Sequence, residues 1–351
     1  MIRVRFVTWI LFVSFSISAH NLIFVHLGDA VPPCIFTTMK QARTLNQDCD
    51  IYLLTDKRAH LFFQSDCHEF LAAERVSLVD MDLIPTTKEH DHFRRINKID
   101  PSLSDGFWLY TSERFFTLFD FIADQNLENI VHLESDSMLY VDLDELYPLI
   151  KQLNIRLAAP FQSLKGCIPC FVFIKDSESL SFLIHHILSE MGDYKGTKPH
   201  IGINDMATLA SFYRKWGVDY LMPLPTLMRE YGQYYPKRKS HFGPDNATPL
   251  SFLSMYASSF PEYIFDAATL GIFINGNDRK YCPQHGPGTI HVRSLFDPRF
   301  FSFFWGEDAK GKNVPYLSFK GKNYRIANMH FHSKMPEEYT SFRETREELN
   351  P

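Results

Sequence analysis

Short apolar runs and stretches with helical spacing alternate along the first two thirds of the chain. Runs that end in polar turn residues predict strands at residues 22–27, 50–54, 75–78, 129–133, 157–160 and 171–174. Apolar residues at helical spacing predict helices at residues 32–42, 59–73, 108–123, 142–149, 179–191 and 204–216. Such alternation is typical of an α/β fold, in which helices cover a mostly parallel central sheet.

Two parts of the chain lack this regular pattern. Residues 80–105 are polar and contain Pro85 and Pro101, so we expect irregular structure there. Beyond about Pro223 the periodicity fades into sequence rich in proline, glycine and aromatic residues. This change predicts a loop-rich C-terminal portion.

The first 20 residues carry the pattern of an export signal. Arg3 and Arg5 precede an apolar run from Phe6 to Ala19, and small residues end that run. The pattern predicts a signal peptide cleaved after Ala19, and an uncleaved signal-anchor or a buried first element are the alternatives. We therefore expect an exported or membrane-anchored protein, in a secretory lumen, in the periplasm or secreted, whose N-terminus can associate with a membrane.

Composition places the chain among ordinary globular proteins. Hydrophobic residues make up 45% of it and charged residues 22%, which argues against wholesale disorder. The net charge of −5 gives no long-range attraction for nucleic acid, and the basic cluster at 237–239 is short. The one Cys-X-X-Cys, Cys167 to Cys170, lacks the second pair that a structural zinc site needs. We expect neither a nucleic-acid partner nor structural zinc.

An acidic pair leaves the end of the fourth predicted strand, in the sequence Glu134-Ser135-Asp136. Residues two apart in an extended segment point to the same side, so the two carboxylates should lie close together on one side of the segment. Two close carboxylates repel unless a cation lies between them, and hard divalent ions accept such oxygens together with substrate phosphates. Ligands of parallel sheets bind beyond the carboxyl ends of the strands. The pair is therefore a candidate Mn²⁺ or Mg²⁺ site, with a solvated turn as the alternative.

A second cluster lies near the C-terminus, in the sequence His330-Phe331-His332-Ser333-Lys334. If this segment is extended, His330, His332 and Lys334 share one face. A neutral imidazole suits Mn²⁺, and a lysine ammonium suits a diphosphate. Together with the acidic pair, the cluster predicts a site for an anion that is bridged to a metal ion.

The order of these features resembles that of the GT-A glycosyltransferases. The stretch from Arg114 through Leu133 to Glu134 and Asp136 is similar to the helix, strand and DxD-type metal motif of that family. Residues 53–56 resemble its second strand, and residues 328–334 resemble its C-terminal histidine and lysine element. The resemblance spans residues 21–335 and implies a GT-A (Rossmann-like) fold that holds a nucleotide-sugar. It implies this division of the chain: 1–20 signal peptide or signal-anchor, 21–222 nucleotide-sugar-binding core, 223–335 acceptor-side region, and 336–351 tail.

The resemblance also implies roles for the side chains of the site. Asp136 would bind the metal directly, whereas Glu134 would bind either the metal or the ribose. Arg114 would lie over the donor sugar or the diphosphate, with a helix-surface arginine as the alternative. Asp205 resembles an acidic residue that faces the donor sugar or the acceptor, and a helix cap would explain it equally well.

The sequence does not decide the roles of several other residues. Asp29 and Asp56 follow the first two predicted strands and are candidates for contacts to the nucleobase or ribose, or ordinary turn residues. The spacing of the C-terminal element departs from the family and does not decide between His330 and His332 as the metal ligand. Residues 265–271 resemble a further stretch of some such enzymes, to which the chemistry of the residues assigns no role.

The sequence thus predicts transfer of a hexose from a nucleotide-sugar, UDP-linked in our interpretation, to a hydroxyl group on a glycan, lipid or protein. The metal would act as a Lewis acid on the diphosphate, and Arg114 and Lys334 would stabilise the leaving charge. Asp205 would accept the acceptor proton if the reaction inverts. A metal-dependent phosphatase or nucleotide hydrolase, with Asp29 as nucleophile, is one alternative. A non-catalytic carbohydrate-binding protein on the same scaffold is another.

Overall fold

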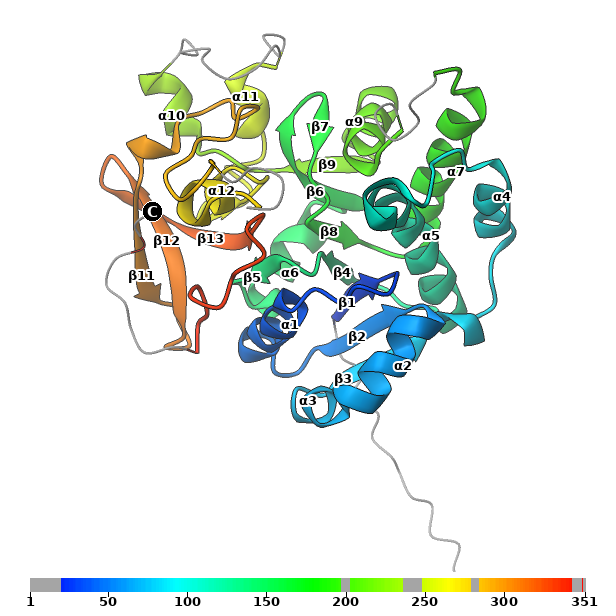
Figure 1. The fold of residues 1–351 in the computed structure, drawn as a ribbon. Coiled ribbons are helices and arrows are strands. Elements are labelled where there is room, and N and C mark those ends of the chain that lie inside the picture. The colour runs from blue at the N-terminus through cyan, green and yellow to red at the C-terminus, as the bar shows by residue number, and fades with distance from the viewer. Residues whose placement is uncertain (1–19, 197–202, 236–247, 279–283, 343–348, 350–351) are drawn as a thin grey trace, which may run out of the picture.

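The computed structural model describes residues 20–196, 203–235, 248–278, 284–342 and 349. The apolar N-terminal run, the basic cluster at 237–239 and Cys282 lie outside the described residues. Two sheets and the helices around them make up the described part (Figure 1).

The larger sheet has eight strands in the order β3-β2-β1-β4-β8-β6-β7, with β9 pairing to β6. Its strands are β1 Asn21–His26, β2 Asp50–Thr55, β3 Val76–Asp80, β4 Ile130–Leu133, β6 Leu157–Ser163, β7 Gly166–Cys167, β8 Phe171–Ile174 and β9 Leu221–Leu224. Strands β3, β2, β1 and β4 run parallel, as do β6 and β9, while β8 runs antiparallel to both β4 and β6. The predicted α/β class with a mostly parallel central sheet is confirmed.

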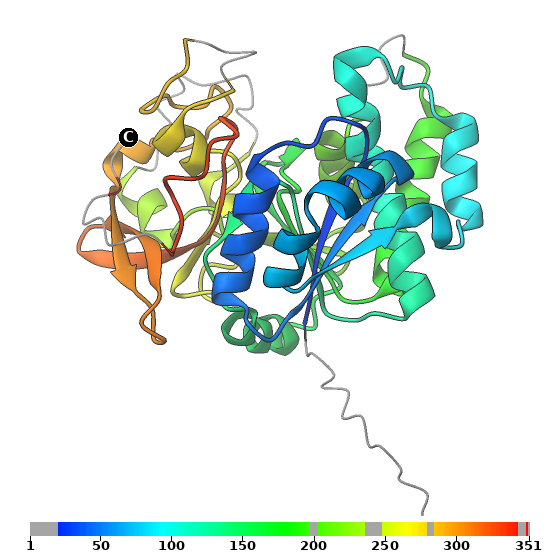
Figure 2. The same cartoon turned by 60° about the horizontal axis from the view of Figure 1, so that its bottom comes forward.

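Helices cover both faces of this sheet (Figures 1 and 2). They are α1 Cys34–Leu45, α2 Lys57–Asp66, α3 His68–Ala73, α4 Lys88–Ile96, α5 Phe107–Gln125, α6 Leu143–Gln152, α7 Ser177–Asp193 and α9 Asp205–Trp216. Successive residues of β1 belong to different cores: Ile23 packs with residues of α5, α7 and α9, whereas Leu22 and Phe24 pack with residues of α1, α2 and α6. Alternation of side chains along the strand therefore builds one core on each face.

The C-terminal part contains a second sheet of five strands, in the order β10-β13-β12-β11, with β5 pairing to β13. Its strands are β5 Ser137–Leu139, β10 Tyr263–Phe265, β11 Ser302–Glu307, β12 Asn313–Phe319 and β13 Lys322–His330. The short helices α10 Arg229–Tyr234, α11 Leu250–Leu253 and α12 Leu270–Asn275 lie in the same part. The sequence pattern did not predict this sheet. Pro315 lies inside β12, and two of its pairings, β5 with β13 and β10 with β13, join strands that are far apart in the chain.

Two local expectations were wrong. Residues 80–105 contain helix α4, and Thr87 caps it by accepting a hydrogen bond from the His90 amide at 3.3 Å. Only two residues of α4 are buried, so its apolar stripe was too narrow to detect in the sequence. The helix expected at 59–73 is interrupted at Cys67, which separates α2 from α3. Among the described residues, we found no helix with both the length and the apolar character needed to cross a membrane.

The chain passes from one sheet to the other within a few residues of the acidic pair. Strand β4 ends at Leu133, and β5 begins at Ser137 and pairs antiparallel with the end of β13, where Ser137 lies opposite His330. Residues 134–136 therefore form the link between the two sheets. This pairing brings the C-terminal histidine beside the acidic segment.

Candidate active site

Glu134, Asp136 and His330 form one cluster at the link between the sheets. Nε2 of His330 lies 3.1 Å from Oε2 of Glu134 and 3.2 Å from Oδ2 of Asp136. One ligand atom from each of the three residues lies within 4.8 Å of the other two. Backbone bonds hold the arrangement, because the Phe331 amide donates to the Asp136 carbonyl at 2.9 Å and the Ser137 amide donates to the Glu134 carbonyl at 3.0 Å. Side chains nearly 200 positions apart thus meet on a rigid frame.

Buried opposite charges set the protonation of this cluster. Burial opposes ionisation of Asp136, but the charges of His330 and Lys334 outweigh it and hold the pKa of Asp136 well below its usual range. Burial likewise opposes the charged form of His330, yet Asp136 and Glu134 raise the pKa of its imidazole. Nζ of Lys334 also contacts Oδ2 of Asp136. The carboxylates are therefore ionised at neutral pH and are ready to receive a cation.

The two C-terminal histidines are not equivalent. His332 does not belong to the three-residue cluster, and its ring packs edge-on against that of His330 with the centroids 4.4 Å apart. Burial, followed by the neighbouring charge of His330, lowers the pKa of His332 well below its usual value. The extended geometry assumed for this segment was wrong: β13 ends at His330, and the Lys334 amide donates to the Phe331 carbonyl at 2.9 Å in a turn. This turn, and not a shared strand face, returns Lys334 to the site.

Arg114 lies on α5 between two carboxylates. Its Nη1 donates to Oε1 of Glu134, and its Nη2 donates to Oδ2 of Asp205 at 2.5 Å. Arg114 is 7% exposed, so the alternative of a helix-surface arginine is wrong. Both terminal nitrogens are bound to protein carboxylates. Arg114 therefore holds the Glu134 side chain in place.

Asp205 begins helix α9 but does not cap it. The cap is Asn204, whose side chain accepts from the Ala207 amide at 3.0 Å. Oδ1 of Asp205 accepts from the Met206 amide at 2.8 Å, and its other oxygen faces Arg114. Burial raises the pKa of Asp205 to about 6 although Arg114 opposes the shift. Asp205 is thus a buried carboxyl group that can exchange a proton near neutral pH.

Asp29 and Asp56 lie where the parallel strands β1 and β2 end, and both have local partners. Asp56 accepts from the Gly28 amide at 2.8 Å and from the Ala59 amide at 3.0 Å, so it caps α2 and holds the turn after β1. Asp29 is exposed and pairs with the exposed Arg58 at 2.9 Å. The ring of Tyr110, on α5, lies against the same turn, where an added Cβ on Gly28 would come within 2.7 Å of it. This aromatic neighbour was not among the residues expected at the site.

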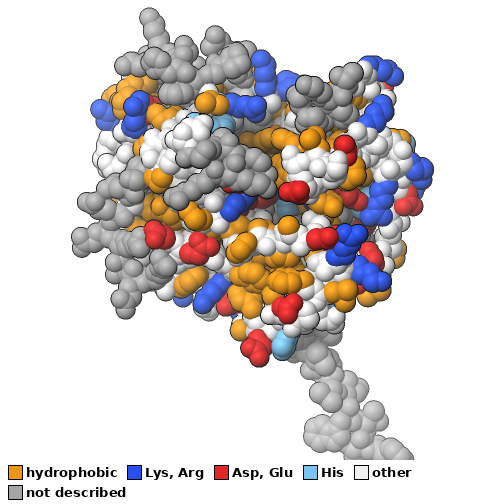
Figure 3. All heavy atoms as spheres, viewed as in Figure 1, with side chains coloured by type: hydrophobic (Ala, Val, Ile, Leu, Met, Phe, Trp, Pro, Cys, Tyr) orange, Lys and Arg blue, Asp and Glu red, His pale blue; other side chains and the backbone are white. Residues whose placement is uncertain are grey.

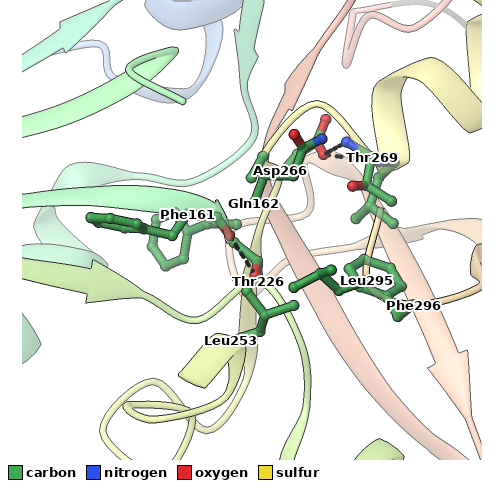
Figure 4. Close-up of a pocket in the computed structure, with 11 residues that line it drawn as sticks. Phe161, Gln162, Thr226, Leu253, Asp266, Thr269, Leu295 and Phe296 are labelled. Carbon is green, nitrogen blue, oxygen red and sulfur yellow. Dashed lines mark hydrogen bonds between the residues drawn. The ribbon is translucent and has the colours of Figure 1, made fainter. Parts of the chain in front are cut away.

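Residues of β6 and of the C-terminal part line a narrow pocket (Figure 4). Its lining includes Phe161, Gln162, Thr226, Asp266 and Phe296, and the space between these side chains is too small for a water molecule. Asp266 connects the pocket to the cluster, because its Oδ2 accepts from the His330 amide at 3.0 Å. The pocket and the charged cluster therefore share one wall.

Charged side chains of both signs are interspersed on the face shown in Figure 3. The described side chains of that face form no continuous basic surface for a polyanion. This observation agrees with the net charge of the whole chain, which is −5.

No protein-family model matches the sequence, and no curated protein matches it. Solved structures that are similar include the PaToxG glycosyltransferase, at 9% identity and a TM-score of 0.40 over 56% of this chain and 68% of that one. Mouse xyloside xylosyltransferase 1 in its apo form is similar at 9% identity and a TM-score of 0.42, over 62% of this chain and 90% of that one. The apo-form glycosyltransferase GlyE of Streptococcus pneumoniae TIGR4 is similar at 18% identity and a TM-score of 0.40, over 66% of this chain and 53% of that one. At such low scores the chemistry of this chain has to be inferred from its own side chains.

Proposed function

We propose that the protein is a metal-dependent glycosyltransferase that moves a hexose from a nucleotide-sugar, UDP-linked in our proposal, to a hydroxyl group on a glycan, lipid or protein. The observation that carries the proposal is the meeting of Glu134, Asp136 and His330 in one buried cluster with Lys334 beside it. This set of groups suits a cation that is bound to a diphosphate. The two carboxylates and the imidazole can bind the cation, and the ammonium group can bind the diphosphate.

The cluster fits Mn²⁺ or Mg²⁺ by its donor chemistry. Carboxylate oxygens suit both ions, and an imidazole nitrogen favours Mn²⁺ over Mg²⁺. When bound, the metal would supply Lewis-acid stabilisation of the leaving diphosphate. In this proposal Glu134, Asp136 and His330 hold the ion, and His332 is left out because its ring does not reach the carboxylates.

Three other side chains would stabilise charge at the site or transfer a proton. Lys334 would exchange its contact with Asp136 for a phosphate oxygen, because its side chain is 43% exposed and can move. Arg114 would keep Glu134 in its ionised and oriented form, and so would act on the donor through Glu134. Asp205 would accept the acceptor proton in an inverting reaction, which its raised pKa of about 6 favours.

The donor's nucleoside would lie beyond the ends of β1 and β2, the edge at which ligands of parallel sheets bind. Asp29 is exposed there and free to exchange Arg58 for a ribose hydroxyl. Asp56 supports the turn that presents Gly28. The acceptor would approach from the second sheet, in keeping with the proposed division into a donor core at 21–222 and an acceptor-side region at 223–335.

A donor panel tests this function. Purified protein is incubated with UDP-sugars and other nucleotide-sugars, in Mn²⁺, in Mg²⁺ or in EDTA, and released sugar or nucleoside diphosphate is measured. We expect metal-dependent turnover with at least one donor and its loss in Asp136→Asn. The matched control is Asp176→Asn, which alters an aspartate that caps α7 by accepting from the Ser179 amide at 2.7 Å.

Three outcomes would contradict the proposal. Activity that survives Asp136→Asn would remove the metal from the mechanism. Phosphate released from free nucleotides, with no sugar released from any donor, would favour the phosphatase alternative. Binding of sugars without turnover of any donor would favour a carbohydrate-binding protein.

We also propose that residues 1–20 are a signal peptide or signal-anchor that brings the enzyme to a secretory lumen, to the outside of the cell or to a membrane. The support is the sequence pattern of Arg3, Arg5 and the apolar run that follows them. Mass spectrometry of the mature N-terminus decides between cleavage after Ala19 and retention of the segment.

A further inference from the structure

Asp266 is a fully buried aspartate whose carboxylate binds four backbone amides. It follows β10, and its Oδ1 accepts from Thr269 at 2.8 Å and from Leu270 at 2.9 Å. Its Oδ2 accepts from Gly271 at 2.9 Å and from His330 at 3.0 Å. Hydrogen bonds to a buried carboxylate are strong because they offset its lost hydration.

These four bonds join two separate elements. Three of the amides belong to the start of α12, so Asp266 neutralises the amino end of that helix. The fourth belongs to His330, the last residue of β13. A second contact strengthens the junction, because the Asn328 side chain accepts from the Asp266 amide at 3.2 Å. One aspartate thereby fixes the end of β13 against α12.

Gly271 allows this junction to be so close. A Cβ added there would lie 2.1 Å from the carbonyl oxygen of His330 and 2.7 Å from its carbonyl carbon. Backbone atoms cannot move aside as a flexible side chain would, so any larger residue would push α12 away from β13. Asp266 attracts the His330 backbone, and Gly271 leaves the space in which it lies.

We propose that Asp266 and Gly271 are positioning residues for His330: together they hold the backbone of the histidine so that its imidazole meets Glu134 and Asp136 before any metal binds. This inference rests on the proposed function, because it assigns His330 to the metal. A strand end followed at once by a turn would otherwise fray, and a metal ligand has to be held to within about 0.5 Å. The carboxylate of Asp266 supplies that restraint without touching the ion.

Mn²⁺ affinity separates this role from simple helix capping. Asparagine at position 266 offers one acceptor oxygen, so Asp266→Asn can satisfy one of the two amide pairs only. Titration followed by the electron paramagnetic resonance of free Mn²⁺ should show about tenfold weaker binding in Asp266→Asn, the range seen when a partner of a metal ligand is removed. Gly271→Ala should weaken binding in the same direction. Asp176→Asn, which also removes a helix-capping carboxylate but lies apart from the cluster, should bind Mn²⁺ as the wild type does.

Amide hydrogen exchange of His330 in the wild-type protein tests the inference without any substitution. If Asp266 positions the histidine, this amide is protected equally with and without Mn²⁺. If it exchanges rapidly until Mn²⁺ is added, the metal organises the site and the positioning role is refuted. This measurement decides the matter even if Asp266→Asn does not fold.

The outcomes distinguish the two proposals. Wild-type Mn²⁺ affinity in Asp266→Asn, with loss of affinity in His330→Ala, would overturn the positioning role and leave the metal site intact. Absence of Mn²⁺ binding by the wild type would overturn the proposed function, and the positioning role along with it.

Discussion

Replacement of Arg114 by methionine tests the charge balance of the site most directly. Arg114 is 7% exposed, and its two terminal nitrogens donate to Glu134 and Asp205. Methionine fills similar space but leaves the buried Asp205 without its cation and Glu134 with His330 alone. Breaking a buried ion pair by removing one partner costs about 3–5 kcal/mol. With an unfolding entropy of about 2.1 cal/mol/K per residue, that loss lowers Tm by about 4–7 °C for a chain of this length.

The loss should depend on pH in a defined direction. Without Arg114, burial raises the pKa of Asp205 further, and Glu134 loses one of the two neighbouring charges, those of Arg114 and His330, that lower its pKa. The folded protein then holds protons that the unfolded chain has released. Stability then falls as pH rises through the raised folded pKa values. The Tm difference between Arg114→Met and wild type should therefore be larger at pH 8 than at pH 5.

Calorimetry or urea unfolding at both pH values measures this difference. Arg43→Met is the matched control, since Arg43 is also buried but, within the described part of the chain, donates to backbone carbonyls alone, among them those of Glu74 and Asn46. Its substitution should cost the same at pH 5 and pH 8. A loss below about 2 °C for Arg114→Met at pH 8, or one that is equal at both pH values, would refute the assignment of Arg114 as the cation of a buried pair.

Other predictions concern the strand ends and the histidine. Asp56→Ala should destabilise the protein by about 1–2 kcal/mol because it removes the cap of α2 and the Gly28 bond, whereas the exposed Asp29→Ala should change stability by about 0.5 kcal/mol or less; urea unfolding that gave the reverse order would contradict these roles. Asp136 raises the pKa of His330. Without metal, the stabilisation from this ion pair is therefore complete below pH 6.5 and is lost as pH rises through the raised pKa. The free energy of unfolding should fall less steeply over this pH range in His330→Gln, and an unchanged slope would count against the ion pair. Because the proton on His330 competes with a metal ion, calorimetric Mn²⁺ affinity should increase from pH 6 to pH 8, and an affinity independent of pH would argue against His330 as a ligand.

The local pattern of the chain was enough to predict six of the eight strands of the larger sheet and the place of the acidic pair. An apolar run followed by Glu134 and Asp136 marks a strand that ends in charges, and parallel strands end at a common edge. Side-chain period and strand polarity are short-range properties, so they can be recognised without a structure. The same reasoning missed α4, whose buried stripe is narrow, and the short strands β7 and β9 of the larger sheet. It also missed the second sheet, in which β5 and β10 pair with the distant β13.

Tertiary structure decided the partners of the charged residues. In the sequence nothing distinguishes Arg114 from other helical arginines. Its partners Glu134 and Asp205 lie 20 and 91 positions away, and only the packing of α5 brings them together. The choice between His330 and His332 depended on where β13 ends and how the chain turns there.

Asp266 shows most clearly that the sequence does not reveal contacts between distant residues. The four amides that its carboxylate binds include one that is 64 positions away, and no spacing in the sequence signals that contact. The sequence by itself determined which residue types stand at the strand ends, because that information is local. Only folding decided which of them touch, because contact between distant residues depends on how the sheets and helices pack against one another.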